Sequence, residues 1–267
     1  MWSPLDADYF QEGGGTFQIV TFTGIAACDL LNQALYDVRP VETRPGAARE
    51  IWERTRAELC VRLEETVRAR HPLSRALFEV AGGRLFGCGR LLERAAAEFA
   101  AVKGARALPT VALAGEIYVR LNAFANDSVI EKLEARGIRA LVAPAGEWFE
   151  YVEYLARAPG GRSGLAARLS YRVMRRIRGR AWAVMARGLG WNGAALSTED
   201  ILAASDPYVR RALEGEAVLT VGEAVAEWRR GHIDGVVCVG PLECMPNKVA
   251  EAQLFHAPLQ FANGRLD

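Results

Sequence analysis

The stretch that decides the fold is residues 111–148, VALAGEIYVRLNAFANDSVIEKLEARGIRALVAPAGEW. It opens with a short apolar run, Val111–Ala114, whose length and following glycine are typical of a buried parallel strand. Apolar residues at helical spacing follow over 129–133, and a second apolar run over 138–143 ends at a proline. Strand, helix and strand within about thirty residues predict a βαβ unit and therefore a parallel sheet flanked by helices.

The loop between this first strand and its helix, residues 115–127, is unusually rich in polar side chains. Ligands of parallel sheets bind at the carboxyl ends of the strands, so we expect the loop to line a pocket. The expected pocket-lining residues are Glu116, Tyr118, Arg120, Asn122 and Asn126. A structural interpretation stays open, in which Arg120 and Asp127 pair with each other and cap the helix that follows.

The composition restricts the class of protein. With 267 residues the chain suffices for one large or two modest domains, each with a buried core. A formal net charge of +1 predicts no general attraction to nucleic acid or membranes. No uninterrupted apolar stretch approaches the about 20 residues that span a bilayer, and the first residues are acidic where a secretory signal is basic. We therefore expect a cytoplasmic protein.

Helical patterns dominate the chain ahead of the βαβ unit. They cover residues 25–38, about 45–70 and 91–102. Residues 1–23 are compatible with a strand or a loop, and 255–267 with a last strand. The sequence thus predicts a mainly helical region over 1–105 and an α/β domain with a Rossmann-like sheet over 106–267.

Arginine is far more frequent than lysine, with thirty arginines against three lysines, which we interpret as a coding bias. Nine arginines and no acidic residue lie between Glu153 and Glu199, on an apolar stripe that predicts a long helix over 164–190. This helix would meet an anion, such as the phosphates of CoA or an acidic partner surface. The alternative is a solvated arginine face.

A glycine-rich segment, AGGRLFGCGR, occupies residues 81–90. Such loops cradle phosphates or expose a thiolate to a metal. Here the segment lacks a preceding strand and the spacing of a phosphate loop, so we interpret it as a turn between helices. The chain also lacks a GxGxxG motif, which argues against an ordinary nucleotide-binding α/β enzyme.

The five cysteines are scattered, and their odd number in a reducing compartment argues against disulfides. They are Cys28, Cys60, Cys88, Cys238 and Cys244. Cys28 and Cys60 lie on or beside apolar helix faces, as core thiols do. Cys244 differs because it follows a predicted strand over 233–239, in the turn before a helix whose N–H groups favour a metal-binding thiolate.

Several segments, in order, resemble the 2-hydroxyacyl-CoA dehydratase and activase-related superfamily. They are GIAACDLLNQALYDVRPVE (24–42), GEIYVRLNAFAND (115–127), PAGEW (144–148), GEAVLTVGEAV (215–225) and GPLECMPNKVAEA (240–252). The resemblance covers most of the chain from about residue 9 to 254. In that family the last segment has the form Gly-Pro-Phe-x-Cys-Met-Pro, and its cysteine is a ligand of a [4Fe-4S] or double-cubane cluster. The resemblance therefore implies that Cys244 ligates iron.

The resemblance implies an iron–sulfur protein of anaerobic metabolism that takes part in ATP-driven low-potential electron transfer or in reductive or dehydratase chemistry. The pocket-lining residues would hydrogen-bond the substrate or the cluster. No catalytic residue is identified.

The chain departs from the family because the further cysteines of family members are not found in these 267 residues. Since a cluster takes about four thiolates, a second subunit would supply the others. An activator of the actin-like ATPase fold would supply electrons to this hetero-oligomer. The alternative is a cluster-less, non-catalytic structural or regulatory subunit of the same fold.

Overall fold

The computed structural model describes residues 14–157 and 164–263, and it divides the chain into two compact units. We call them the helical unit and the α/β unit. The helical unit consists of the residues up to Gly104 together with Pro144–Ala195. The α/β unit consists of Ala105–Ala143 and the residues from Leu196 onward.

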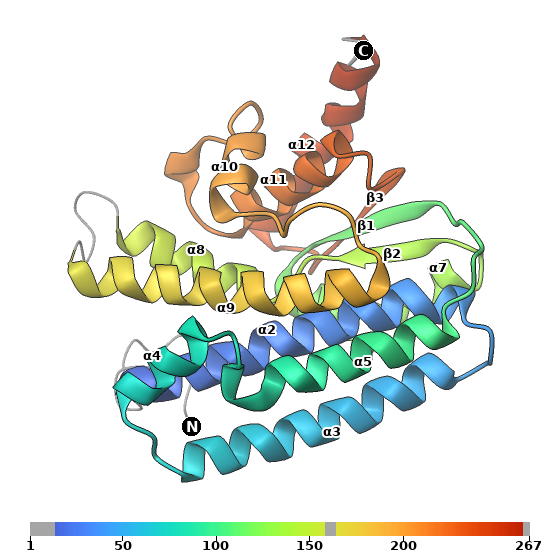
Figure 1. Ribbon diagram of the computed structural model, residues 1–267. Helices are drawn as coiled ribbons and strands as arrows, with labels where there is room; N and C mark the ends of the chain where they lie inside the picture. Colours follow the sequence, from blue (N-terminus) through green and yellow to red (C-terminus); the bar gives the residue numbers. More distant parts are fainter. Residues whose placement is uncertain (1–13, 158–163, 264–267) are drawn as a thin grey trace. The chain divides into compact units, whose positions relative to one another are not determined.

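The helical unit is a bundle in which α2, α3, α5 and α9 pack against one another (Figure 1). Its elements are α2 (Gly14–Val38), η1 (Arg39–Val41), α3 (Ala47–Arg68), α4 (Leu73–Ala81), η2 (Leu85–Gly87), α5 (Cys88–Val102), α8 (Gly146–Ala156) and α9 (Leu165–Leu189). Large apolar side chains at helical spacing fill its core, because each helix buries one stripe against the others. The fully buried members include Leu31, Leu59, Leu92, Phe99, Ile177 and Met185.

Helix α2 corrects the expectation of a strand or loop over residues 1–23. Residues 14–23 are the first turns of this helix, and residues 1–13 lie outside the described part of the chain. The apolar side chains of Ile19, Val20 and Phe22 are buried, so packing decides a segment whose local pattern was ambiguous. By length and composition, Gly14–Val41 is also apolar enough to cross a membrane, and 50% of its most apolar stretch is buried inside the protein. A bundle core helix has the same properties.

One carboxylate connects the ends of three helices in this unit by hydrogen bonds. Asp37, at the end of α2, accepts a hydrogen bond of 2.6 Å from Lys103 Nζ, just after α5. The same Oδ2 atom accepts one of 2.8 Å from Trp191 Nε1, just after α9. Because Asp37 is only 9% exposed, this network holds a charge that water hardly reaches.

The α/β unit contains a three-stranded, wholly parallel sheet with the strand order β2-β1-β3. Its strands are β1 (Thr110–Gly115), β2 (Arg139–Val142) and β3 (Gly235–Val239). Its helices are α6 (Ile117–Leu121), α7 (Val129–Glu134), α10 (Thr198–Ser205), η3 (Arg211–Leu213), α11 (Glu216–Arg229) and α12 (Met245–Asn263). The predicted βαβ unit and parallel sheet are thereby confirmed, within a chain that is mostly helical.

Two boundaries differ from the prediction. The basic helix over 164–190 exists as α9, but it packs against α2 and α5 and belongs to the helical unit, together with α8. The apolar stripe of α9 completes the bundle core. The periodicity of a stripe predicts a buried helix face, but it does not predict which domain core that face will join. The expected last strand is wrong, since α12 continues as a helix to Asn263. Residues 264–267 lie outside the described residues.

Candidate functional site

The carboxyl edge of the sheet contains a topological switch point between β1 and β3. The chain leaves β1 towards β2 on one side, whereas β3 pairs with β1 on the other side. The two backbones approach closely there, because Glu116 N–H donates to the Val239 carbonyl at 3.0 Å. In open α/β sheets, ligands bind at this kind of position. The expected site residues that follow β1 and Cys244, which follows β3, therefore belong to the same edge.

Most polar side chains of the β1–α7 loop serve the loop itself. Glu116 is the N-cap of α6 and accepts from the N–H groups of Tyr118 at 3.1 Å and Val119 at 2.8 Å. Asn122 Oδ1 accepts from the N–H groups of Phe124 and Ala125. These groups act as caps and turn formers, as the structural interpretation anticipated.

The side chains of Asn126 and Asp127 also make contacts within the loop and with α7. Asn126 Nδ2 donates to the carbonyl of Val119 at 2.9 Å, and its Oδ1 accepts from the first N–H of α7, that of Val129, at 3.2 Å. The anticipated pair of Arg120 and Asp127 is wrong, because Asp127 pairs with Lys132 instead. Of the residues expected to line a pocket, Glu116, Asn122 and Asn126 are thus engaged with backbone groups.

Arg120 is the exception in this loop. It is 3% exposed, and its Nη1 donates to the Gly115 carbonyl at 3.1 Å. Within the described residues it has no ion pair, and its Nε has no hydrogen-bond partner. Burial raises the pKa of the nearby Glu216 carboxyl, and the positive charge of Arg120 opposes that rise. A buried cation without a paired carboxylate is unfavourable, so Arg120 is the strongest functional residue at this edge.

The two cysteines at this edge differ in their surroundings. Burial, reinforced by the charge of Glu251, raises the pKa of the Cys238 thiol to about 11, and its Sγ contacts Asn247 Oδ1 at 3.5 Å. Cys238 is therefore a protonated thiol at neutral pH. Cys244 is half-buried, in the turn that enters α12. No cluster of three or more His, Cys, Asp or Glu side chains suited to a metal occurs in the described residues, so iron at Cys244 requires further ligands from elsewhere.

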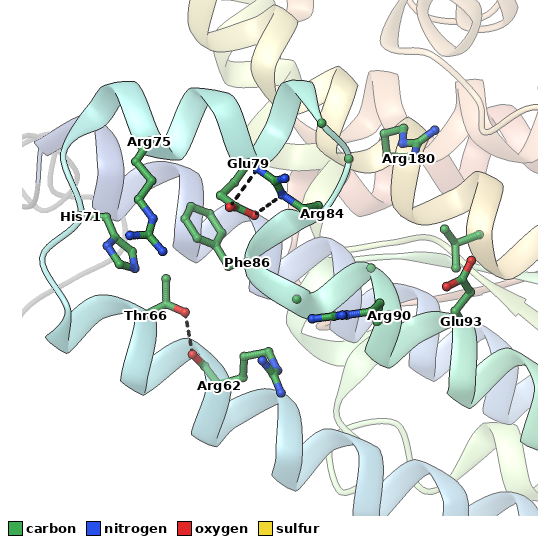
Figure 2. A pocket seen from close by; sticks show the side chains of 15 residues that line it. Arg62, Thr66, His71, Arg75, Glu79, Arg84, Phe86, Arg90, Glu93 and Arg180 are labelled. Carbon is green, nitrogen blue, oxygen red and sulfur yellow. Dashed lines mark hydrogen bonds and ion pairs between the residues drawn. The ribbon is translucent and has the colours of Figure 1, made fainter.

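A pocket of about 520 Å³ lies in the helical unit, among α3, α4, the α4–α5 loop, α5 and α9 (Figure 2). We call it the arginine pocket. Seven of its lining residues have charged side chains: Arg62, Arg75, Arg84, Arg90, Arg180, Glu79 and Glu93. The other lining residues are His71, Thr66, Phe86, Val184 and the four glycines Gly82, Gly83, Gly87 and Gly89. The glycine-rich segment over 81–90 does form a turn between helices, but it is also a wall of this pocket.

The glycines of that segment make room for the arginines. Gly83 has φ +70° and Gly87 has φ +86°, a region that favours glycine. A Cβ atom on Gly87 would lie 2.7 Å from Arg62 Nη1, and one on Gly83 would overlap the guanidinium of Arg180. Two guanidinium groups from α3 and α9 therefore lie directly against the loop backbone.

The charges of the arginine pocket are only partly compensated. Arg84 pairs with Glu79 at 3.4 Å, and Arg62 is 3.9 Å from Glu58. Within residues 14–157 and 164–256, the side chains of Arg75, Arg90 and Arg180 have no hydrogen-bond or ion-pair partner. No side chain of that same part of the chain caps the first turn of α5, and although the Gly89 N–H donates to the Arg84 carbonyl at 3.3 Å, this end of the helix dipole adds positive potential.

Sequence reasoning missed this pocket, but its interpretation of the glycine-rich segment as a turn between helices agrees with the burial of Cys88. Cys88 is fully buried, and burial raises the pKa of its thiol to about 11, so it offers no thiolate to a metal. In α9, Arg178 pairs with the buried Glu150 at 2.7 Å and Arg176 donates to the Ala81 carbonyl, whereas Arg180 faces the pocket. The basic helix thus has arginines that serve the structure and one that lines the pocket.

Comparison of the chain with models of known families, with curated proteins and with solved structures gave no match.

Proposed function

We propose that the protein binds a small ligand carrying phosphate groups in the arginine pocket. The observation that supports this most strongly is that Arg75, Arg90 and Arg180, which have no partner among the described residues, line one concave site. Guanidinium groups form bidentate, charge-assisted hydrogen bonds with phosphate oxygens. A volume of about 520 Å³ lies within the range of about 300–1,000 Å³ that small-molecule sites occupy.

The alternative of a solvated arginine face fits the neighbouring surface better than the pocket. On α5, Arg94 pairs with Glu58 of α3, and Arg54 of α3 pairs with Glu98. One turn before Arg94, Arg90 lines the pocket and has no such carboxylate within the described residues. Arg54 and Arg94 are thus neutralised by neighbouring carboxylates, whereas Arg90 is not, which favours a ligand that brings negative charge to the pocket.

Calorimetric titration with pyrophosphate tests the proposal. We expect saturable binding by the full chain and a loss of about ten-fold or more in affinity for Arg90→Gln and for Arg180→Gln, because each variant removes a hydrogen bond to a charged group. Arg94→Gln is the matched control, since it removes an arginine from the same helix outside the pocket. Absence of binding at millimolar pyrophosphate, or an equal loss in the control, would refute the proposal.

A second candidate function concerns the carboxyl edge of the sheet. We propose that Cys244 supplies one ligand of an iron–sulfur cluster, and that the sheet is Rossmann-like. Support comes from its position beside the β1/β3 switch point and from two exposed apolar neighbours, Leu242 at 84% and Met245 at 73%, which suit a partner surface. A partner subunit would supply the other cysteines, and an activator of the actin-like ATPase fold would supply electrons.

Iron and acid-labile sulfide contents after anaerobic purification test this second candidate. We expect both in a complex co-expressed with the adjacent reading frame, and their loss in Cys244→Ser. Cys60→Ser is the control, because Cys60 belongs to the helical unit and is exposed, contrary to the core thiol that the sequence predicted. Unchanged iron in Cys244→Ser would remove this residue from the site, and colourless preparations throughout would favour a cluster-less subunit.

A further inference from the structure

We infer that the ligand of the arginine pocket is a nucleoside diphosphate, whose base stacks on the rings of His71 and Phe86. The inference rests on the proposed function of the pocket and names the class of its ligand. It depends on three observations: a pair of parallel rings, a strained turn that presents one of them, and carboxylates among the arginines.

The first observation is the ring pair. The rings of His71 and Phe86 have centroids 6.4 Å apart and planes that differ by 5°. Both residues line the pocket and both are half-buried, so their surfaces are in part available to a ligand. A planar base stacks on such rings without regard to its hydrogen-bonding pattern, because every base has an aromatic face. Parallel rings in an otherwise charged pocket favour a ligand with both a planar and an anionic part.

The arrangement within the pocket matches the two parts of a nucleotide. Figure 2 shows His71 and Arg75 at one end of the pocket, Phe86 beside them, and Arg180 with Glu93 at the other end. Arg90 lies between these ends, next to the first turn of α5. A base at the ring end therefore leaves its phosphates within the part of the pocket that carries Arg90 and Arg180.

The second observation is backbone strain at the ring. Leu85 and Phe86 have φ values of +51° and +56°, so two successive residues other than glycine adopt the left-handed conformation. Such residues are uncommon and cluster at functional sites, because the surrounding structure must hold them in place; Asp127 and Ser128 form another such pair in this chain. Leu85 is 1% exposed and anchors the turn in the core, and the next residue, Phe86, then lines the pocket. The strained turn fixes the position of this ring.

The third observation is the presence of carboxylates among the arginines: Glu79 lies nearer the ring end of the pocket, whereas Glu93 lies beside Arg180 at the other end (Figure 2). Carboxylates oppose the binding of a bare phosphate, whereas the hydroxyl groups of a ribose and the amino group of a base donate hydrogen bonds to them. A nucleotide can therefore place its phosphates on the arginines and donate hydrogen bonds to a carboxylate. The absence of a P-loop or GxGxxG motif from the sequence is compatible with this, because here arginines and a helix N-terminus replace the glycine-rich loop of an α/β sheet.

Competitive calorimetry with ADP, UDP and pyrophosphate on the full chain tests the inference. At least one nucleotide should bind about ten-fold or more tightly than pyrophosphate, by the contribution of base stacking. Phe86→Asn and His71→Asn should remove most of this advantage, because each lowers nucleotide affinity more than pyrophosphate affinity. Asparagine tolerates the left-handed conformation, so Phe86→Asn keeps the turn while it removes the ring. Phe124→Ala is the control, since Phe124 is 95% exposed in the α/β unit.

The outcomes separate the inference from the proposed function. Pyrophosphate binding without a nucleotide preference would overturn the inference and leave phosphate binding intact. A nucleotide preference that both ring variants retain in full would also overturn the inference alone. Absence of binding by all three compounds would overturn the proposed function, and the inference with it. Circular dichroism of each variant confirms that the helical unit is folded.

Discussion

Gly115→Ala is expected to lower the free energy of unfolding of the α/β unit by about 3 kcal/mol or more. Gly115 ends β1 with φ +118°, a conformation that side chains rarely adopt. A Cβ atom built there would overlap the carbonyl oxygen of Val239, which already accepts the Glu116 N–H at 3.0 Å. The atoms that the new Cβ would meet all belong to the backbone of Val239, so no side chain can move aside to relieve the overlap. Urea denaturation followed by circular dichroism measures the change.

Gly235→Ala provides the control for this experiment. Gly235 pairs with Val111 in the same sheet, and among the described residues a Cβ atom there would meet only Val111 Cγ1 at 3.7 Å, an ordinary van der Waals distance. We expect little change or a slight gain in stability, because alanine has fewer conformations than glycine in the unfolded chain. Equal losses for the two variants would show that the close approach of β1 and β3 is not what Gly115 provides.

The second large effect is expected for Asp37→Leu, which should destabilise the helical unit by about 2–4 kcal/mol. The variant leaves the Lys103 ammonium, whose side chain is 25% exposed, and the Trp191 N–H without their shared acceptor. It also disconnects the ends of α2, α5 and α9. Asp37→Asn should lose less, since an amide oxygen still accepts from Trp191. The shift of the urea midpoint at constant slope measures both effects.

Glu64→Ala is the matched comparison for a surface ion pair. Glu64 pairs with Arg68 four residues later on α3, and the two side chains are 60% and 74% exposed. We expect a loss below about 1 kcal/mol, because water and salt screen exposed pairs. A loss of that size for Asp37→Leu would contradict the central role of its carboxylate.

The β1–α7 loop shows why density of polar residues is a weak predictor of a pocket. Its composition suggested a ligand, yet Glu116, Asn122 and Asn126 satisfy backbone N–H and carbonyl groups within the loop itself. A sharply turning chain leaves such groups without secondary-structure partners, and short polar side chains supply the missing ones. Only Arg120 exceeds this local need, because it is buried and carries a charge with no ion-pair partner in the described residues.

The arginine pocket is the opposite case, a pocket that the sequence did not predict. Its residues come from α3, α4, the α4–α5 loop, α5 and α9, and each segment has an ordinary amphipathic or turn-like pattern. The sequence pointed to Arg120 and to the basic helix over 164–190, but among thirty arginines it did not single out Arg62, Arg75 or Arg90. The signal within the sequence was the glycine-rich segment, whose glycines the structure explains by the guanidinium groups of Arg62 and Arg180.

The sequence by itself determined many, but not all, of the local elements of this protein; the start of α2 and the end of α12 differ from the prediction. The apolar run at Val111 and the stripe of α9 predicted a strand and a helix close to their observed limits, because residues near in sequence decide these periodicities. Only the tertiary structure decided that α9 joins the helical unit and that arginines from separate helices converge on one pocket. Burial and charge compensation depend on residues distant in sequence, and a local pattern does not specify which distant residues will meet.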